Sequence, residues 1–205
     1  LIEEFLNGIE LSVFVLTDGS GYVILPEAKD YKRIGDGDTG PNTGGMGAVS
    51  PVVFADSAFM QKIEDRVVKP TITGLQKEGI DYKGFIFVGI MNVGGNPFVI
   101  EYNARMGDPE TQAVLLRIKS DFVELLVAAA KGELDSMKID IDEHFAVTIA
   151  LVSGGYPGEY VTGKVIQGLE HTGEAMVFHA GTSRNEETVQ THGGRVLAIS
   201  AKGSS

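Results

Sequence analysis

Glu101, Asn103 and Arg105 follow one another at intervals of two residues within the segment FVIEYNARMGDPET. Side chains alternate between the two faces of a strand, so this spacing predicts that all three lie on one face. Carboxylate and amide oxygens are hard ligands that suit Mg²⁺, and a guanidinium can bind a phosphate. The spacing alone leaves two interpretations open, a magnesium–phosphate site or an exposed sheet face with an ion pair. The alternate positions are apolar and predict a buried row, Phe98, Ile100 and Tyr102.

The glycine-rich segment 28–50 is the second candidate, because a long loop with few apolar residues is usually functional. Its GDGDTG sequence matches the GxGxxG pattern of dinucleotide-binding proteins, but no helix signal follows, so NAD binding has little support. The glycines of PNTGGMG allow consecutive backbone N–H groups to converge on an anion. Basic residues stand just ahead of them, at Lys29, Lys32 and Arg33. We therefore predict an anion-binding loop rather than a flexible surface loop.

The composition excludes several classes of protein. The chain has 205 residues, 43% of them hydrophobic, which is enough for one large domain or two small ones. It has no cysteine, so it has no disulfide and no thiolate metal site, which is consistent with a cytoplasmic protein. A net charge of -11 disfavours nucleic acid as a partner, and no apolar run is long enough for a membrane span.

The hydrophobic pattern predicts an α+β protein with an antiparallel sheet and helices in residues 1–136, followed by a small β-rich domain in residues 137–205. Turn and cap residues mark the expected elements. These are strands over 1–27 with a hairpin at DGSG, a loop over 28–50, a helix after Asp56 that Pro70 kinks or splits, a strand pair over 84–103, helices from Asp108 to about Lys119 and from Ser120 to Gly132, and short β runs thereafter, including YVTGKVIQGL.

Three motifs in chain order resemble the ATP-grasp superfamily: EEFLNGIE from Glu3 to Glu10, the glycine-rich loop, and E-x-N-x-R at 101–105. The longer blocks KDYKRIGDGDTGPNTGGMGA, NARMGDPETQ and SGGYPGEYVTG are similar to the phosphoribosylamine–glycine ligase family. The resemblance runs from residue 1 to about 200. It implies the C-terminal half of an ATP-grasp domain and the β-rich domain behind it. The family's N-terminal domain and lid do not appear, so we expect a fragment that is inactive alone.

The resemblance also implies roles for single residues. Arg105 matches a catalytic arginine near the transferring phosphoryl group, and Glu101 and Asn103 match ligands of Mg²⁺, for which Mn²⁺ is an alternative. Segment 84–93 lacks the further metal carboxylate that many ATP-grasp enzymes have there. The ATP-binding residues would be Glu3, Phe5, Leu6 and Glu10. The acceptor-substrate loop would include Lys32, Arg33, Asn42, Thr43, Gly44, Gly45 and Gly47, which the resemblance does not divide between glycine and a ribose phosphate.

The implied activity is the ATP-dependent ligation of glycine to 5-phosphoribosylamine in cytoplasmic purine biosynthesis. Glycyl phosphate is the intermediate, and the products are glycinamide ribonucleotide, ADP and phosphate. The partners would be these small molecules, with neither nucleic acid nor membrane, and the sequence does not predict the oligomeric state. Two other hypotheses remain. A different ATP-grasp ligase is disfavoured by the GPNTGGMG loop, and a non-catalytic nucleotide-binding module is favoured by the missing front domain and lid.

Overall fold

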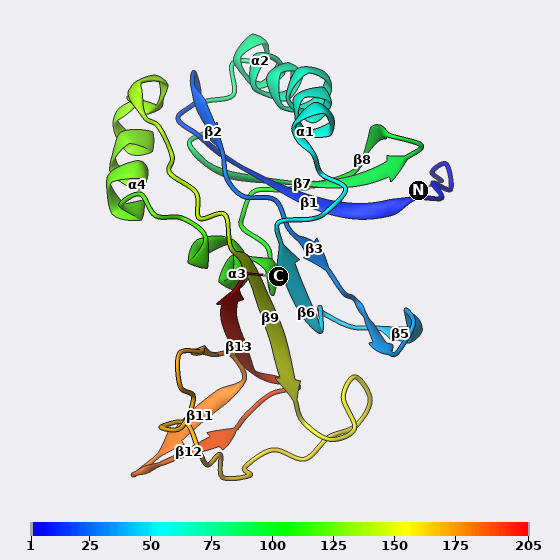
Figure 1. The fold of residues 1–205 in the computed structure, drawn as a ribbon, viewed down its shortest axis with the longest axis vertical. Coiled ribbons are helices and arrows are strands. Elements are labelled where there is room, and N and C mark those ends of the chain that lie inside the picture. Colours follow the sequence, from blue (N-terminus) through cyan, green and yellow to red (C-terminus); the bar gives the residue numbers. More distant parts are fainter. Residues whose placement is uncertain (1, 205) are drawn as a thin grey trace. The chain divides into compact units, whose positions relative to one another are not determined.

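The computed structural model describes residues 2–204, and the chain divides into two compact units whose elements are labelled in Figure 1. The first unit contains the chain up to Lys29 together with residues 51–107 and 117–143. The second contains Asp30–Ser50, Asp108–Leu116 and the chain from His144 onward. The α+β class is confirmed, whereas the division at residue 136 stays a prediction. Within residues 2–204, no helix is both long enough and apolar enough to cross a membrane.

The first unit contains a four-stranded antiparallel sheet in the order β2-β1-β7-β8. Its strands are β1 (Ile9–Thr17), β2 (Tyr22–Ile24), β7 (Gly84–Val93) and β8 (Asn96–Asn103). The two predicted hairpins are confirmed by the pairs Thr17–Tyr22 and Val93–Asn96. The prediction of strands from the start of the chain was wrong for residues 2–8, which form neither helix nor strand.

A continuous helical segment covers one face of this sheet (Figure 1). It consists of α1 (Ser57–Ile63), a π-helical turn (Glu64–Val68) and α2 (Lys69–Lys77). The Phe59 N–H donates to the carboxylate of Asp56 at 2.8 Å, which is the predicted N-cap. Pro70 lies in the first turn of α2, directly after the π-helical turn, so the predicted interruption is observed. The buried core joins Leu11, Val13, Val15, Ile86, Val88 and Ile90 of the sheet to Phe59, Ile63, Val67, Val68 and Ile72.

Helix α4 (Phe122–Lys131) also belongs to the first unit, and its two ends follow from its sequence. The Asp121 carboxylate caps the N-terminus by accepting from the N–H groups of Val123 and Glu124. Gly132 ends the helix with a φ of 80°, the left-handed conformation that glycine adopts at little cost. The predicted helix is therefore confirmed. A short 3-10 turn, Leu134–Ser136, follows it.

Asp18 is a buried carboxylate that stabilises the β1–β2 turn. Its Oδ1 accepts from the N–H groups of Ser20 and Gly21 at 2.8 and 2.6 Å, and its Oδ2 accepts from the N–H of Leu134 at 3.0 Å. Burial opposes ionisation of this carboxyl, but the hydrogen bonds outweigh that cost and lower its pKa from 3.8 to about 2. The ionised side chain therefore stabilises the folded state.

We expect Asp18→Asn to reduce the free energy of unfolding by about 2 kcal/mol at pH 6. Because the pKa is lowered on folding, the contribution is complete above the unfolded value of 3.8 and is lost as the pH falls through about 2. Urea unfolding of the wild type and the variant would measure it. The difference between them should shrink by roughly half at pH 3. An equal difference at both pH values would contradict an ionic role for Asp18.

The second unit is built on a five-stranded sheet in the order β10-β13-β9-β6-β3. Helix α3 (Glu110–Leu116) packs on it through Ala113, which contacts Ala48 and Ala146. The strands are β3 (Lys29–Asp30), β6 (Gly47–Ser50), β9 (Phe145–Val152), β10 (Met176–His179) and β13 (Arg195–Gly203). Two further hairpins are formed by β4 (Arg33–Gly35) with β5 (Thr39–Asn42) and by β11 (Thr182–Asn185) with β12 (Thr188–Thr191).

Two sequence predictions for this unit were wrong. Segment 28–50 is not a structureless loop, because it contains strands β3 to β6. The run YVTGKVIQGL is not a strand and makes one isolated bridge, between Val165 and Gln190. Strand β6 pairs with β9, and Val165 pairs with Gln190, so these partners lie far away along the chain, where local hydrophobic patterns carry no information about them. Strands β4 and β5 pair locally, but both are short and mostly polar, so they lack the apolar alternation of a strand. The predicted concentration of strands after residue 136 is confirmed.

Candidate functional site

The register of the first sheet places Glu10 and Glu101 on the same face. Directly paired residues on neighbouring strands have their side chains on one side of a sheet. Gly89 of β7 pairs with Ser12 of β1 and with Glu101 of β8. Glu10 precedes Ser12 by two residues, so its side chain is on that side as well. The alternate positions of β1 are core residues that pack against α1 and α2. The shared face is therefore the one opposite α1 and α2. Further along it Phe14 and Phe87 are buried, so we use the name open face only for its end at Glu10, Glu101 and Asn103.

Asn103 follows Glu101 by two residues along β8 and lies on the same open face. It pairs with Phe87, whose ring packs edge-to-face against Phe14 of β1 with 5.5 Å between the ring centroids. The Nδ2 atom of Asn103 is buried and has no hydrogen-bond partner in the part of the chain that the structure describes. A buried donor without an acceptor is costly, so this amide is well suited to a ligand oxygen. Glu101 and Asn103 thus share a face, as their spacing predicted.

A β-bulge changes the rest of the predicted alternation on β8. Ile100 is the extra residue between two consecutive pairs of the β7–β8 ladder, so Phe98 lies on the same face as Glu101. The prediction of one buried apolar row was therefore wrong. Phe98, Ile100 and Tyr102 are 43, 40 and 49% exposed. The physical reason is the position of β8 at the edge of the four-stranded sheet.

Arg105 does not continue the row, because β8 ends at Asn103. That part of the prediction was also wrong. The Arg105 side chain is exposed, and its Nη1 donates to the carbonyl oxygen of Met106 at 2.9 Å. The guanidinium thus makes a local contact with the adjacent residue. Its candidate role rests on its place in the motif and stays a prediction.

The open face fits a magnesium ion that has few protein ligands and takes most of its coordination from the phosphate oxygens of a bound molecule and from water. Glu101 supplies a carboxylate and Asn103 an amide oxygen, whereas β7 contributes no carboxylate. Across residues 2–204, no three His, Asp or Glu side chains gather in a way that could hold a metal ion. Mg²⁺ commonly takes one or two protein ligands and completes its shell with phosphate oxygens and water. The donors present fit that kind of site and do not fit an all-protein cage.

The other predicted ATP-binding residues precede the first strand. Glu3, Phe5 and Leu6 lie in residues 2–8, which have no regular structure, and Phe5 is 89% exposed. Glu10 is on β1 and is half-buried. The structure therefore places Glu10 on the same sheet face as Glu101 and Asn103, and it leaves the roles of the three earlier residues as predictions.

The glycine-rich loop of the second unit does not form the predicted anion-binding nest. Four consecutive backbone amides in the loop already donate to protein acceptors. These bonds are Thr43 N–H to the Lys32 carbonyl at 2.7 Å, Gly44 N–H to the Tyr156 hydroxyl at 3.0 Å, Gly45 N–H to Thr43 Oγ1 at 3.1 Å, and Met46 N–H to the Tyr31 carbonyl at 2.7 Å. The exposed side chains of Lys32, Arg33 and Asn42 remain candidates for contact with an anion.

The GDGDTG sequence forms the β4–β5 hairpin. Gly35 pairs with Thr39 across the turn, and Gly37 and Asp38 take positive φ values of 67° and 58°. A dinucleotide-binding fingerprint requires a strand before it and a helix directly after it. Here a second strand follows the turn, so the geometry argues against NAD binding, as the sequence had indicated.

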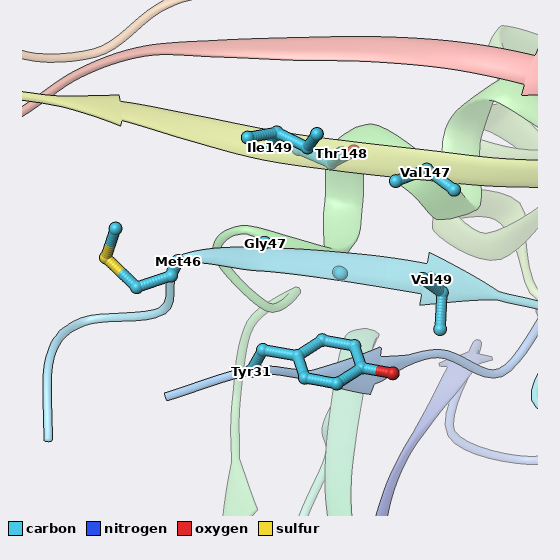
Figure 2. Close-up of a pocket in the computed structure, with 8 residues that line it drawn as sticks. Tyr31, Met46, Gly47, Val49, Val147, Thr148 and Ile149 are labelled. Atoms are coloured by element: carbon cyan, nitrogen blue, oxygen red, sulfur yellow. The ribbon is translucent and has the colours of Figure 1, made fainter. Parts of the chain in front are cut away.

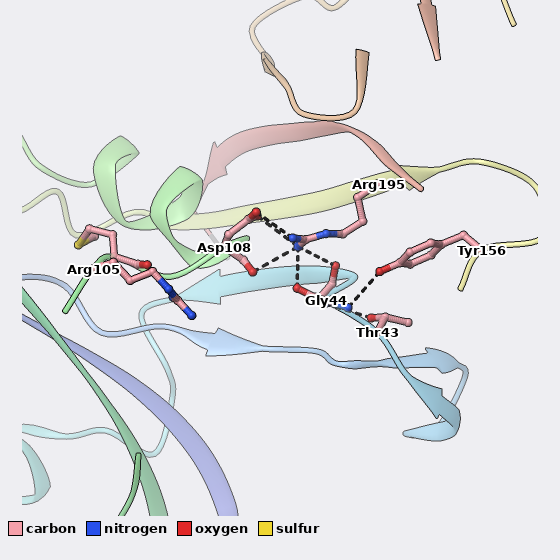
Figure 3. A network of polar contacts seen from close by, with 8 residues as sticks. Thr43, Gly44, Arg105, Asp108, Tyr156 and Arg195 are labelled. Carbon is pink, nitrogen blue, oxygen red and sulfur yellow. Dashed lines mark hydrogen bonds and ion pairs between the residues drawn. The ribbon is translucent and has the colours of Figure 1, made fainter. Parts of the chain in front are cut away.

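Arg195 contacts the glycine-rich loop, and the sequence analysis did not select it. Its Nη2 binds Oδ2 of Asp108 at 2.8 Å, and its Nη1 donates to the carbonyl oxygen of Gly44 at 2.6 Å (Figure 3). The sequence pattern started a helix at Asp108, whereas α3 begins at Glu110 and the Asp108 carboxylate pairs with Arg195. The three residues are far apart in sequence, so only the fold brings them together. Tyr156, the acceptor for Gly44, lies in the SGGYPGEYVTG block that supported the resemblance.

The second unit also has an apolar hollow of about 260 Å³ over β3, β6 and β9 (Figure 2). It is lined by Tyr31, Met46, Gly47, Ala48, Val49, Val147, Thr148 and Ile149. None of these side chains carries a charge at neutral pH. The hollow is therefore unsuited to binding phosphates or a metal ion.

Residues 1–111 match the sequence model described as "Phosphoribosylglycinamide synthetase, ATP-grasp (A) domain". The first part of the chain is thus an ATP-grasp domain. Residues 146–205 match the model of the C domain from the same synthetase. The chain belongs to the phosphoribosylglycinamide synthetase family.

Similar proteins cover nearly all of this chain. Phosphoribosylamine–glycine ligase from Escherichia coli O6:H1 is 48% identical over 207 residues, which are 99% of this chain and 48% of the relative. The ligase of the same name from Chlorobaculum tepidum is 47% identical over 98% of this chain and 48% of its own. The crystal structure of phosphoribosylamine–glycine ligase from Thermotoga maritima is similar with a TM-score of 0.88 and 38% identity, covering 99% of this chain and 50% of that one. The chain therefore spans about half the length of the curated relatives it matches.

Proposed function

We propose that this chain is part of an ATP-dependent ligase that joins glycine to 5-phosphoribosylamine and forms glycinamide ribonucleotide, ADP and phosphate. The observation that carries the proposal is the match to relatives of that name, 47–48% identical over 98–99% of this chain. The open sheet face with Glu10, Glu101 and Asn103 supports it, because these side chains suit a nucleotide and its metal ion. Since the relatives are about twice as long, we expect turnover from the full-length protein rather than from this chain alone.

In this proposal the open face binds ATP. Glu10 would accept a hydrogen bond from the ribose, and Glu101 and Asn103 would hold Mg²⁺, with Mn²⁺ as an alternative. The ion, when bound, neutralises charge on the phosphate oxygens. The unpartnered Nδ2 of Asn103 is available to donate to a phosphate oxygen. The residues that would contact the adenine are Glu3, Phe5 and Leu6.

The proposed reaction has two steps. A carboxylate oxygen of glycine attacks the γ-phosphorus of ATP, the bond from that phosphorus to the bridging oxygen breaks, and ADP leaves glycyl phosphate behind. The amine of phosphoribosylamine then attacks the carbonyl carbon, phosphate leaves, and the nitrogen loses a proton. No covalent protein intermediate is needed, so the protein acts by positioning and by stabilising charge. Arg105 would donate to the transferring phosphoryl group as its charge redistributes.

The acceptor substrates would meet the glycine-rich loop of the second unit. Lys32 and Arg33 are exposed cations in an otherwise acidic chain, and they suit the phosphate of phosphoribosylamine. The other loop residues proposed for acceptor binding are Asn42, Thr43, Gly44, Gly45 and Gly47. Because the loop amides are already paired and the carbonyl oxygens of Gly44 and Gly45 accept from Arg195, the exposed side chains would make the direct contacts.

The test is ADP release from ATP by the full-length protein, with glycine and freshly generated phosphoribosylamine added singly and together. Release that requires both acceptors supports the proposal. ADP release with a different pair of acceptors would identify another ATP-grasp ligase. Binding of ATP without turnover under any of these conditions would indicate a non-catalytic nucleotide-binding module.

Gly89 provides the space that Glu101 occupies on the open face. A Cβ at position 89 would lie 3.1 Å from Cγ of Glu101, which is closer than carbon atoms normally pack. We expect Gly89→Ala to displace the carboxylate and raise the KM for Mg²⁺–ATP about fivefold. ATP titrations of the full-length protein would measure this.

Gly74→Ala is the matched control for this prediction, because a Cβ at position 74 would meet no atom within 4 Å. It should leave the KM for Mg²⁺–ATP unchanged. If both substitutions gave the same KM, the close approach of Gly89 to Glu101 would have no part in ATP binding.

A further inference from the structure

Arg195 connects three segments of the second unit. From the first residue of β13, its Nη1 donates to the carbonyl oxygen of Gly44 at 2.6 Å and lies 3.4 Å from that of Gly45. Its two terminal nitrogens also reach the Asp108 carboxylate, Nη1 to Oδ1 at 3.2 Å and Nη2 to Oδ2 at 2.8 Å. A bidentate arginine–carboxylate pair is geometrically specific. One side chain therefore holds both the glycine-rich loop and the turn before α3.

The surroundings of Arg195 indicate that it does not bind substrate itself. Its side chain is only 23% exposed, and its charge is compensated by Asp108. Nη1 also lies 3.2 Å from the backbone carbonyl oxygen of Asp108, so several protein oxygens share its protons. A phosphate would have to displace these acceptors. The contacts of the Arg195 side chain therefore hold backbone segments in place.

Tyr156 holds Gly44 from its other side. Its hydroxyl oxygen accepts from the Gly44 N–H at 3.0 Å, while Arg195 takes the carbonyl of the same residue (Figure 3). A Cβ on Gly44 would lie 3.1 Å from Cζ of Arg195, and a Cβ on Gly194 would overlap the Tyr156 ring. Both glycines thus allow the close approach of these side chains. The peptide groups on both sides of Gly44 are fixed by residues from the C-terminal part of the chain.

We propose that Arg195, assisted by Tyr156, is a positioning residue that fixes the glycine-rich loop in the conformation that the acceptor substrates meet. The C domain would then contribute to acceptor binding without touching a substrate. The same side chain holds Asp108, which follows Arg105 by three residues in the sequence. We call the hold of Arg195 and Tyr156 on Gly44 the clamp. The identity of the substrates rests on the proposed function, whereas the clamp rests on contacts within the second unit.

The experiment compares Arg195→Met, Arg195→Lys and Tyr156→Phe in the full-length protein. In Arg195→Met we expect the KM for glycine or for phosphoribosylamine to rise at least about tenfold, with the KM for ATP within about twofold of the wild type. Arg195→Lys keeps the charge but loses the planar fork, so it should recover only part of this loss. Tyr156→Phe keeps the ring, removes the acceptor for Gly44, and should raise the same KM about threefold. Arg184→Met, an exposed arginine of β11, is the control.

Backbone hydrogen exchange provides a readout that does not depend on turnover. We expect the amide of Gly44 to exchange at least about tenfold faster in Arg195→Met and in Tyr156→Phe than in the wild type. Unchanged acceptor KM values in folded variants would overturn the proposal. It would also be overturned if the KM values for ATP and both acceptors rose together with a matching loss of thermal stability, because Arg195 would then be merely structural. If the wild type itself required other acceptors, the proposed function would fail, and unchanged Gly44 exchange in the variants would overturn the clamp independently.

Discussion

Glu101→Gln in the full-length protein is expected to lower kcat at saturating acceptors by at least about 100-fold while leaving the fold intact. Glutamine has almost the same shape as glutamate, but it lacks the negative charge that holds a hard cation. No carboxylate on β7 is present to compensate for this loss. Glu101 is exposed at the edge strand, so its replacement removes no core packing. The measurement is initial rate as a function of Mg²⁺ concentration, which should show a strongly raised requirement for the ion.

Glu78→Gln is the matched control for this effect. Glu78 is an exposed carboxylate at the end of α2, the helix that packs on the opposite face of the sheet, and it has no role in the proposed site. Its replacement should leave both the rate and the Mg²⁺ dependence as in the wild type. If Glu101→Gln behaved like Glu78→Gln, Glu101 would not be a metal ligand. Equal thermal melting of both variants and the wild type would show that only the chemistry had changed.

The elements that sequence reasoning predicted correctly are those whose signals are local. DGSG and Gly94–Gly95 allow tight turns between apolar runs, and both hairpins were found there. Asp56 caps the start of α1, and Gly132 ends α4, each through contacts within a few residues. In each case the stabilising groups are close in sequence, so the pattern alone contains the required information.

The features that could not be predicted depend on partners far along the chain. The extra residue at Ile100 is defined by the register of β8 against β7, and nothing in NPFVIEYN specifies it. Strand β6 exists because it pairs with β9, with Val49 opposite Val147. Arg195 is recognisable only when β13 is placed beside the loop at Gly44.

The candidate site shows the same division between local and long-range information. Glu101 and Asn103 were selected from their spacing, and the ladder places them on one face. The spacing could not show that Glu10 shares this face, because that depends on the pairing of β1 with β7. It also extended the row to Arg105, although β8 ends two residues earlier. Alternation therefore holds only as far as the hydrogen-bonded ladder continues.

Arg105→Ala is expected to lower kcat about 100- to 1,000-fold, with the KM for ATP changed by less than about threefold. In its proposed role Arg105 contacts the transferring phosphoryl group, and such a contact strengthens most as charge redistributes in the transition state. The fold should tolerate the change, because the side chain is exposed and its bond to Met106 is local. The measurement is steady-state kinetics combined with direct ATP binding to the full-length variant.

Arg66→Ala removes another exposed arginine, one in the π-helical turn on the opposite side of the first sheet, and should leave kcat unchanged. Arg105→Lys distinguishes charge from geometry, since lysine keeps the charge but cannot form two parallel hydrogen bonds. A rate close to the wild type in Arg105→Lys would mean that a point charge is sufficient. If Arg105→Ala weakened ATP binding and left kcat intact, Arg105 would bind the ground state, and the stabilisation of the phosphoryl group would have to come from another residue of the full-length protein.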